Sequence, residues 1–360
     1  AEVAIYGYVH TNYALLSYER QLEHLRQARE TFDRLAIPHQ GFRAPYQYWN
    51  SDTLRAVAAA RLAYDSSSLV GWDVVDQAMA LEKGWKWDEY QRVVALRQPQ
   101  DAAQVLSLPA WTCGIVEIPG SFPDDESLID WLAVANPEDV AQTWLTALGQ
   151  ACRRDELLTL QLHQERVGFW RPALEAVLAR ARAARPAPWV ATLSEIAGWW
   201  NERRDFRWQR IRGGSGRYTA RLLATPRASV LFKGTPPPDL QTRPWAAGWR
   251  RVKGQVVSIP GGKRPVVGVP EKAPRALVAF LQSEGYIVEV GRRRGQAVFL
   301  EGYTRFRPQD VRQVLSEIDA SPGPLVRFGR WPDGARGALA VTGAIGAVTW
   351  WDFAWRLVES

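Results

Sequence analysis

The sequence of residues 1–206 alternates short apolar runs with longer stretches of helical periodicity. Residues 3–10, "VAIYGYVH", are typical of a buried strand, and residues 17–37 follow with helical spacing. The apolar positions that define this helical face are Leu22, Leu25, Ala28, Phe32 and Leu35. Ser17 is the expected N-cap. A strand followed by a helix, repeated along the chain, predicts βαβ units around a largely parallel sheet.

The same alternation continues to residue 204. The expected strands are 41–45 "GFRAP", 63–68 "AYDSSS", 114–120 "GIVEIPG" and 156–163 "ELLTLQLH". The expected helices are 50–62, 123–133, 137–154, 171–184 and 192–204. Asn50 or Ser51 would cap the first of these helices, and acidic residues at the start of 123–133 would complement the helix dipole.

The pattern changes near Arg212. Short alternating strands separated by Gly- and Pro-containing turns follow, interrupted by two helical patterns at 273–285 and 307–318. We interpret 207–325 as an additional α+β region. Residues 326–360 return to a strand, "GALAVTG" at 337–343, and a helix at 349–358. This division gives a first domain at 1–206, an accessory region at 207–325 and a C-terminal strand and helix that rejoin the first domain.

Composition excludes some classes of protein. The 360 residues are 46% hydrophobic and 23% charged, which suits a large buried core. No apolar run is long enough to span a membrane, and the first residues do not resemble a signal peptide. A bacterial cytoplasmic or cell-envelope location would fit these features. The net charge of +7 comes with no nucleic-acid-binding motif, so we expect no nucleic-acid partner.

The cysteine and tryptophan contents add two expectations. Cys113 and Cys152 could form one disulfide bond, but two buried thiols are favoured over a bridge. The 18 tryptophans are unusually many, and an exposed subset of them would suit a glycan ligand.

Four short motifs occur in a fixed order along the first domain: "VHTNYALLS" at 9–17, "GFRAPYQYWN" at 41–50, "YDSSS" at 64–68 and "LQLHQERV" at 160–167. Together they resemble the polysaccharide deacetylase, or NodB-homology, family of carbohydrate esterases. Residues 114–128 and 192–204 also look like segments of that family. The resemblance implies an α/β fold, a distorted (β/α) barrel of the NodB type, whose strand ends hold a divalent metal, usually zinc. In such a site the metal polarises an acetamide carbonyl and activates a water molecule.

The resemblance also implies roles for individual residues. His10 would be a metal ligand at a strand end. Arg43 would orient a catalytic acid, and the backbone N–H of Tyr46 would help to hold the developing oxyanion. Asp65 would be the acidic residue of its motif, and His163 would protonate the leaving amine.

The sequence departs from the family at most of the metal ligands. The second histidine of the first motif is replaced by Ala14, and Asn12 is a weak neutral ligand. Segment 330–353 resembles the family's first strand, but Ala344 and Gly346 stand where acidic residues are expected. A single histidine cannot hold zinc well, because catalytic zinc sites normally need three protein ligands. The metal is therefore expected to be weakly bound or absent.

Two functions remain open at this point. The first is a glycan N-deacetylase with an impaired site, or one that recruits Asp73, Asp76 or His163 as substitute ligands. The second is a non-catalytic glycan-binding or scaffold protein of the cell envelope. Each site residue also has a plain structural alternative: His10 could be a hydrogen-bonded strand-end histidine, and Arg43 and Asp65 could form a structural ion pair.

Two structural predictions follow from the resemblance. A glycan at the barrel mouth should contact the aromatic residues Trp49, Trp72, Tyr46 and Tyr48, which follow strand ends. Residues 337–342 should pair in parallel beside 3–8, as in a circularly permuted barrel, because an unfilled position would expose two strand edges. The helix 349–358 would then pack outside, and Ala344 and Gly346 would lie near His10.

Overall fold

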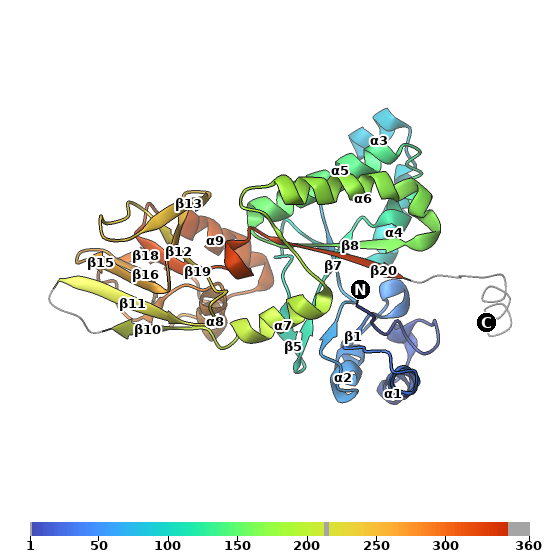
Figure 1. The fold of residues 1–360 in the computed structure, drawn as a ribbon, viewed down its shortest axis with the longest axis horizontal. Helices are drawn as coiled ribbons and strands as arrows, with labels where there is room; N and C mark the ends of the chain where they lie inside the picture. Colours follow the sequence, from blue (N-terminus) through green and yellow to red (C-terminus); the bar gives the residue numbers. More distant parts are fainter. Residues whose placement is uncertain (1, 212–215, 345–360) are drawn as a thin grey trace.

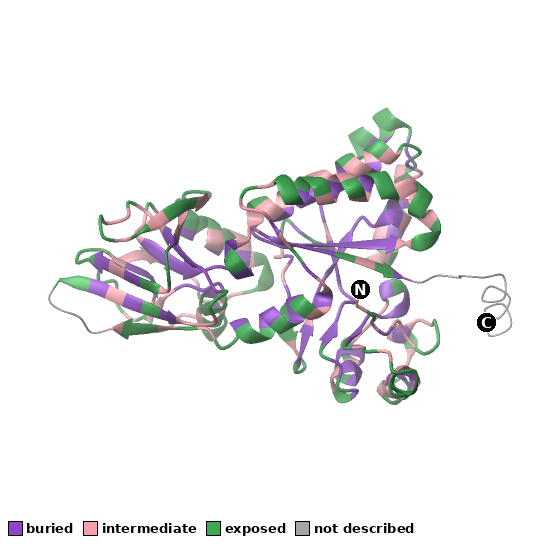
Figure 2. Cartoon of the chain, viewed as in Figure 1, coloured by how far each residue is buried: buried purple, intermediate pink, exposed green. Residues whose placement is uncertain are grey.

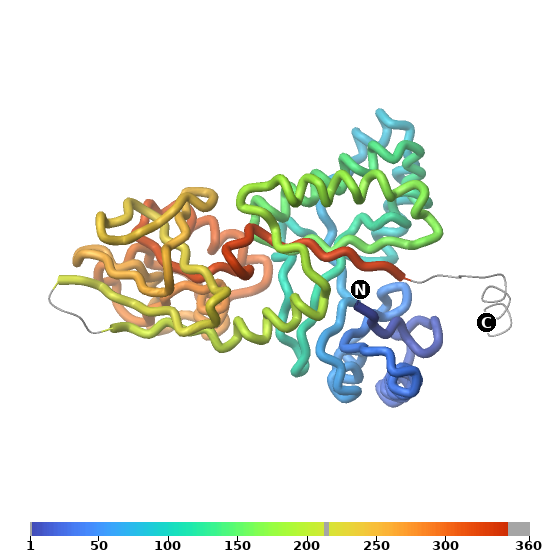
Figure 3. Tube along the Cα trace, in the orientation of Figure 1, coloured from blue at the N-terminus to red at the C-terminus, as the bar shows by residue number. Residues whose placement is uncertain are grey.

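The computed structural model describes residues 2–211 and 216–344. It is a mixed α/β protein in two parts, with residues up to about 206 in one part and most of the remainder in the other (Figure 1). The chain crosses back once, near residue 330, so that its last described strand lies in the first part (Figure 3). No helix in the described ranges is long and apolar enough to cross a membrane.

Two extended segments form the middle of the first part. One holds β2 (Tyr64–Asp65) and β3 (Leu69–Gly71), and the other holds β6 (Ile115–Glu117) and β7 (Gly120–Phe122). β2 pairs in parallel with β6, and β3 pairs in parallel with β7. The flanking strands are β1 (Gly41–Phe42), β4 (Gln100–Asp101) and β5 (Ala110–Thr112). β1 and β4 are parallel to their neighbours and β5 is antiparallel, so the sheet is largely parallel as predicted.

A second parallel sheet lies beside these strands. Its order is β8 (Leu157–His163), β20 (Ala338–Ala344) and β9 (Trp189–Val190). The ladder between β20 and β8 runs from Ala338 opposite Leu157 to Ala344 opposite His163. β8 is linked to β7 through Ser121, whose hydroxyl accepts a hydrogen bond of 2.9 Å from the Thr159 backbone N–H.

The predicted partner of the C-terminal strand was wrong, although its parallel direction and its place in the first part are confirmed. β20 pairs with β8 and β9 rather than with 3–8. The N-terminal segment forms only an isolated parallel bridge, from Ile5 to Phe42. Gly7, at φ +88°, ends its extended course, so it cannot provide a long ladder, whereas β8 offers a continuous apolar strand. Within the described ranges the strands do not close into a barrel. Gly346 and the helix expected at 349–358 lie outside the described residues.

Most expected helices of the first part are present. They are α1 (Tyr18–Arg34), α2 (Ser51–Ala59), α5 (Pro137–Arg154), α6 (Val167–Ala183) and α7 (Leu193–Arg203). Two further helices, α3 (Gln77–Lys83) and α4 (Trp87–Arg97), were not predicted. Ser17 and Asn50 cap α1 and α2 as predicted. The helix expected at 123–133 is reduced to a short π-helical turn at Ser127–Trp131. α5 and α6 pack together along the outer side of β8 and β20 (Figure 1).

The second part contains antiparallel and parallel sheets with two helices. The first sheet has the order β10 (Arg207–Ile211), β11 (Arg217–Leu223) and β15 (Val256–Pro260). The second has the order β13 (Thr242–Ala246), β14 (Trp249–Val252), β12 (Val230–Lys233) and β19 (Leu325–Phe328). The third has the order β17 (Val288–Val290), β16 (Arg264–Val269) and β18 (Gln296–Phe299). The helices are α8 (Arg275–Ser283) and α9 (Val311–Ala320).

One apolar core crosses the boundary between the parts (Figure 2). It joins Tyr64 and Trp199 of the first part to Tyr218 of the second, with the fully buried Trp331 between β19 and β20. The indole N–H of Trp331 donates to the Asp155 carbonyl at 3.0 Å, and that of Trp199 donates to the Arg330 carbonyl at 2.8 Å. Both indoles therefore bury large apolar areas without leaving an unpaired N–H group.

Buried ion pairs reinforce this junction. Arg330 donates to Glu284 (Nε–Oε2 2.9 Å) and to the Asp155 carbonyl, and it is 4% exposed. Arg327 of β19 is 3.0 Å from Asp155, which follows α5. Although burial alone would lower the pKa of Arg330, the charges of Glu284 and Asp155 raise it, so the arginine stays charged.

Replacing Arg330 by alanine should lower the free energy of unfolding by about 3–5 kcal/mol, because Glu284 would remain buried without its partner. Urea unfolding would measure this loss. Arg171→Ala breaks the exposed pair with Glu175 and should cost less than about 1 kcal/mol. Equal losses for the two variants would contradict a structural role for the buried pair.

Candidate functional site

Arg43 links β1 to the C-terminal strand β20. Its guanidinium donates to the Ser66 carbonyl (2.8 Å), the Ser66 hydroxyl (2.9 Å) and the Thr342 hydroxyl (2.9 Å). The Thr342 hydroxyl in turn donates to the Leu160 carbonyl of β8. No ion pair joins Arg43 to Asp65 in the described part of the chain, so the structural ion pair considered for them is not formed. Arg43 instead donates hydrogen bonds to neutral oxygens, and these bonds connect β1 to the turn after β2 and to β20.

Asp65 is fully buried at the end of β2. Its carboxylate accepts hydrogen bonds from the Ser67 backbone N–H (2.9 Å) and hydroxyl (2.7 Å), which shapes the "DSSS" turn. Burial raises the pKa of Asp65 to about 6, against the lowering effects of Ser67 and Arg43. Its neighbour across the ladder is Glu117, whose pKa is raised to about 7 by burial and by the charge of Asp65. Asp65 of β2 and Glu117 of β6 are therefore two neighbouring carboxyl groups with raised pKa values.

His163 ends β8 and forms a dyad with Asp125. Its ring Nδ1 lies 2.7 Å from Asp125 Oδ1, and its backbone N–H donates to Oδ2 of the same carboxylate at 2.6 Å. Burial lowers the pKa of His163, but the hydrogen bond and charge of Asp125, together with Asp124 and Glu126, raise it overall. The Asp125 carboxylate favours a proton on Nδ1, which leaves Nε2 as the second ring nitrogen for proton transfer.

The sequence singled out His163 but not its partner. Asp125 is fully buried and comes three residues after β7, in "PDDES". The run of acidic residues was interpreted as favourable charge at a helix start. Its position after a predicted parallel strand is the signal that could have identified it, because the ends of neighbouring parallel strands lie at one edge of a sheet.

Ala344 lies beside this dyad. It is the residue of β20 that stands in register with His163, and it is 8% exposed. Thr342, two residues earlier, contacts Arg43, and side chains two apart in a strand point to the same face. The position at which the family resemblance expects an acid is therefore next to His163 and on the Arg43 side of β20.

Aromatic rings gather around His10. Its ring lies 4.4 Å from the Tyr46 ring and 5.4 Å from the Tyr6 ring, measured between centroids. Tyr46 has a left-handed backbone (φ 55°), and its carbonyl accepts a hydrogen bond from Arg97. Burial raises the pKa of Tyr6, while Arg43 and a hydrogen bond with the Tyr46 backbone lower it. The Tyr46 backbone, expected to hold an oxyanion, is thus already engaged with Tyr6.

A cavity of about 610 Å³ separates the N-terminal segment from β20. Its walls include Tyr6, Phe42, Arg43, Thr342 and Ala344. Asp65 and His163 do not line it in the described part of the structure. This cavity occupies the place at which 3–8 and 337–342 were predicted to pair, and it is large enough for a small-molecule ligand.

Some predicted site residues have other roles. Trp72 is 4% exposed and its indole N–H donates to the Ser121 hydroxyl, so little of the ring that was predicted to contact a glycan is accessible. Asn12 caps a short turn by accepting from the Ala14 N–H. Asp76 caps α3, and Asp73 is exposed.

The remaining two rings and the cysteines are also placed. The ring centroids of Tyr48 and Tyr46 lie 6.1 Å apart. Trp49 is half-buried against the apolar core next to α1 and α2. Both cysteines are free: Cys152 is half-buried, but Cys113 is exposed, which corrects the expectation of two buried thiols.

The donor set does not fit the zinc that the resemblance implies. The described residues contain no group of three or more His, Cys, Asp or Glu side chains arranged to hold a metal ion. His163 directs Nδ1 at Asp125, Asn12 is used as a cap, and Ala14 and Ala344 have no donor atoms. We therefore derive no chemical step through a metal.

Comparison with known proteins identifies no relative: no family model matches the chain, and neither a curated protein nor a solved structure is significantly similar to it.

The dyad makes a testable prediction about pH. Because the folded pKa of His163 lies above its usual value of 6.5, the dyad's contribution to stability is fully present below that value and is lost as the pH rises through the folded pKa. Asp125→Asn should lower the pKa of His163, because it removes the negative charge that favours the protonated ring. NMR titration of the histidine ring measures both values. An unchanged pKa in Asp125→Asn would contradict the dyad.

Asp65 should make stability fall with rising pH. Its pKa is raised on folding from 3.8 to about 6, so the folded state keeps a proton that the unfolded state loses, between about pH 4 and pH 7. Asp65→Asn should remove about 2–3 kcal/mol of this decline. Unfolding free energies at several pH values test it, with the exposed Asp73→Asn as control. An identical decline in wild type and Asp65→Asn would show that folding does not raise the pKa of Asp65.

Proposed function

We propose that this protein acts on or binds amino-sugar glycans at a polysaccharide-deacetylase-like site, with impaired hydrolysis. The observation that carries the proposal is the His163–Asp125 dyad at the end of β8, in register with Ala344 of β20. The order of parallel strands supports it, because the segments that carry "VHT", "RAPY", "DSS" and "LQLH" follow one another around the first part. A distorted, incompletely closed barrel of the NodB type would have this order.

The dyad can supply one half of an amide hydrolysis. A protonated His163, held by Asp125, can donate a proton from Nε2 to a leaving amine, and the hydrogen bond and charge of Asp125 raise the pKa of His163, which favours this protonated form. The other half needs a base and a polarised carbonyl. Ala344 provides no base, and the Tyr46 backbone that would hold the oxyanion is engaged with Tyr6. Binding without efficient turnover is the expected behaviour.

A second candidate is a non-catalytic glycan-binding or scaffold protein of the cell envelope. The observation that favours it is Ala344, an apolar residue in register with His163, where the resemblance implies a carboxylate. Under this alternative, glycan binding depends more on Tyr46 than on His163, because Tyr46 is 43% exposed and its ring lies beside that of Tyr48.

Activity and binding assays separate these two functions. Acetate release from N-acetylglucosamine oligomers should be absent or very low, since the missing base and carbonyl polarisation each contribute several kcal/mol to the barrier. Any activity present should be lost in His163→Ala and kept in His39→Ala, because His39 contacts the Ile37 carbonyl, Asp33 and Phe32 rather than the dyad. Fast, chelator-sensitive acetate release would show that the metal ligands are elsewhere.

Calorimetric titration with chitin oligomers tests binding. Tyr46→Ala should weaken the interaction by about tenfold through loss of an exposed stacking ring. Trp72→Phe, at a buried indole, is the matched aromatic control and should leave affinity unchanged. Absence of binding by the wild type would exclude a glycan role at this site.

A further inference from the structure

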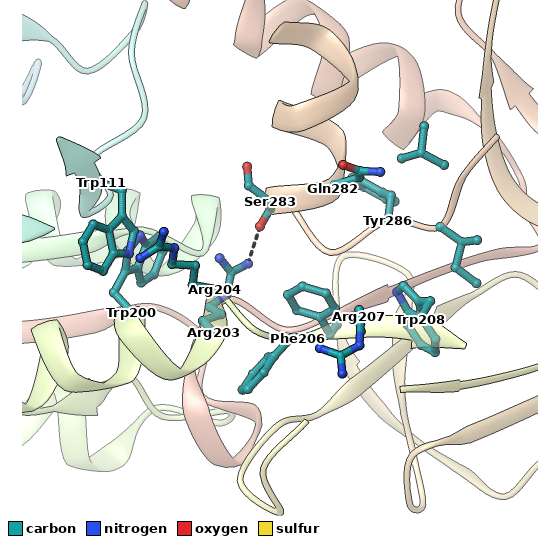
Figure 4. Close-up of a pocket in the computed structure, with 13 residues that line it drawn as sticks. Trp111, Trp200, Arg203, Arg204, Phe206, Arg207, Trp208, Gln282, Ser283 and Tyr286 are labelled. Atoms are coloured by element: carbon teal, nitrogen blue, oxygen red, sulfur yellow. Dashed lines mark hydrogen bonds between the residues drawn. The ribbon is translucent and has the colours of Figure 1, made fainter. Parts of the chain in front are cut away.

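A second pocket lies between the two parts, away from His163. It has a volume of about 510 Å³ and is walled by the end of α7, the start of β10 and the turn after α8 (Figure 4). Three arginines, Arg203, Arg204 and Arg207, form its cationic wall, and no acidic side chain among the described residues lines it. Most of the other lining side chains are aromatic or apolar: Trp111, Trp200, Phe206, Trp208, Tyr286, Ile287, Val288 and Phe328.

Arg203 is the buried cation of this pocket. It is 7% exposed, and its Nη2 donates to the Ser283 carbonyl at 2.8 Å, as drawn in Figure 4. Its Nε is buried and has no hydrogen-bond partner. An unpaired N–H on a buried charged group costs free energy, so the structure leaves a strong donor unused here.

The nearby acidic side chains form ion pairs with other arginines. Glu284 is bonded to Arg330, and Asp155 pairs with Arg327. Burial, with a smaller contribution from the charges of Arg330 and Arg327, lowers the pKa of Arg203 to about 10, against the opposing effects of Glu284 and Asp155. In the described part of the chain, Arg203, Arg204 and Arg207 form no ion pair of their own. An anion in the pocket would balance this charge.

The aromatic side chains determine what the anion should be attached to. The Arg204 guanidinium lies 4.5 Å from the centre of the Trp111 ring, and that of Arg203 lies 4.7 Å from the centre of the Trp200 ring. In Figure 4 Trp111 and Trp200 lie at one end of the pocket and Trp208 at the other, with the arginines between them. Trp111 is 37% exposed, so a ring can reach it.

We propose that this pocket binds a small anionic ligand in which a phosphate or carboxylate is attached to a ring. The arginines would hold the anion by charge-assisted hydrogen bonds, and an indole would stack on the ring. The volume suits a single sugar phosphate, a uronic acid or a nucleoside monophosphate. This site is separate from the proposed glycan function and does not depend on it.

Tryptophan fluorescence titration tests the proposal. The probes are inorganic phosphate, glucose 6-phosphate, glucuronate, adenosine monophosphate and neutral glucose. At least one ring-bearing anion should bind more tightly than inorganic phosphate, and glucose should not bind. Binding of glucose 6-phosphate or glucuronate identifies a saccharide source, and binding of adenosine monophosphate identifies a nucleotide. No binding by any ring-bearing anion, or equal binding by phosphate alone, overturns the proposal.

Matched arginine variants locate the site. Arg204→Ala and Arg207→Ala are exposed substitutions and should each weaken binding by about tenfold or more, the effect of losing a charge-assisted contact. Arg210→Ala removes an exposed arginine of the same strand that lies over Tyr218 rather than in the pocket, and it should leave binding unchanged. An equal loss in all three variants would indicate general charge attraction and overturn the site. His163→Ala should not affect this binding. The anion pocket and the proposed glycan function can therefore be tested independently.

Discussion

The buried arginine network at the junction of the two parts is the interaction on which the rest of the structure depends. Arg330 and Arg327 come from the segment that leaves the second part, and their partners Glu284 and Asp155 come from both parts. Charges this deeply buried are stable only when they are paired with good geometry. The network therefore fixes where the chain crosses back, and with it the start of β20.

The position of β20 in turn builds the candidate site. Because β20 begins beside Glu156 and runs in parallel with β8, its last described residue falls next to His163. Its Thr342 reaches Arg43 of the N-terminal part. A strand from the end of the chain thus joins two motifs that lie far apart in sequence, and the second part acts as the connection that delivers it.

Local structure was largely predictable, and long-range pairing was not. The caps at Ser17 and Asn50, the long helices and the apolar strand β8 follow from periodicity and side-chain chemistry close in sequence. The partner of β20 depends instead on which exposed edge offers the longest ladder. Gly7 limits the N-terminal segment, so β8 takes that place. Asp125 and Glu117 were missed for the same reason, since their roles depend on partners on other strands.

The two proposed sites share a physical feature: each contains buried ionisable groups that form no ion pair in the described part of the chain. Asp65 and Glu117 are buried where ionisation is costly, and Arg203 is buried with an unused donor. In the junction, by contrast, each buried acid has an arginine partner. Arg327 of the junction also has a buried Nε without a hydrogen-bond partner, but its guanidinium is paired with Asp155, whereas Arg203 has no carboxylate partner among the described residues. Unbalanced buried groups lower stability and concentrate at functional sites, so Arg203 is better explained by a ligand than by packing.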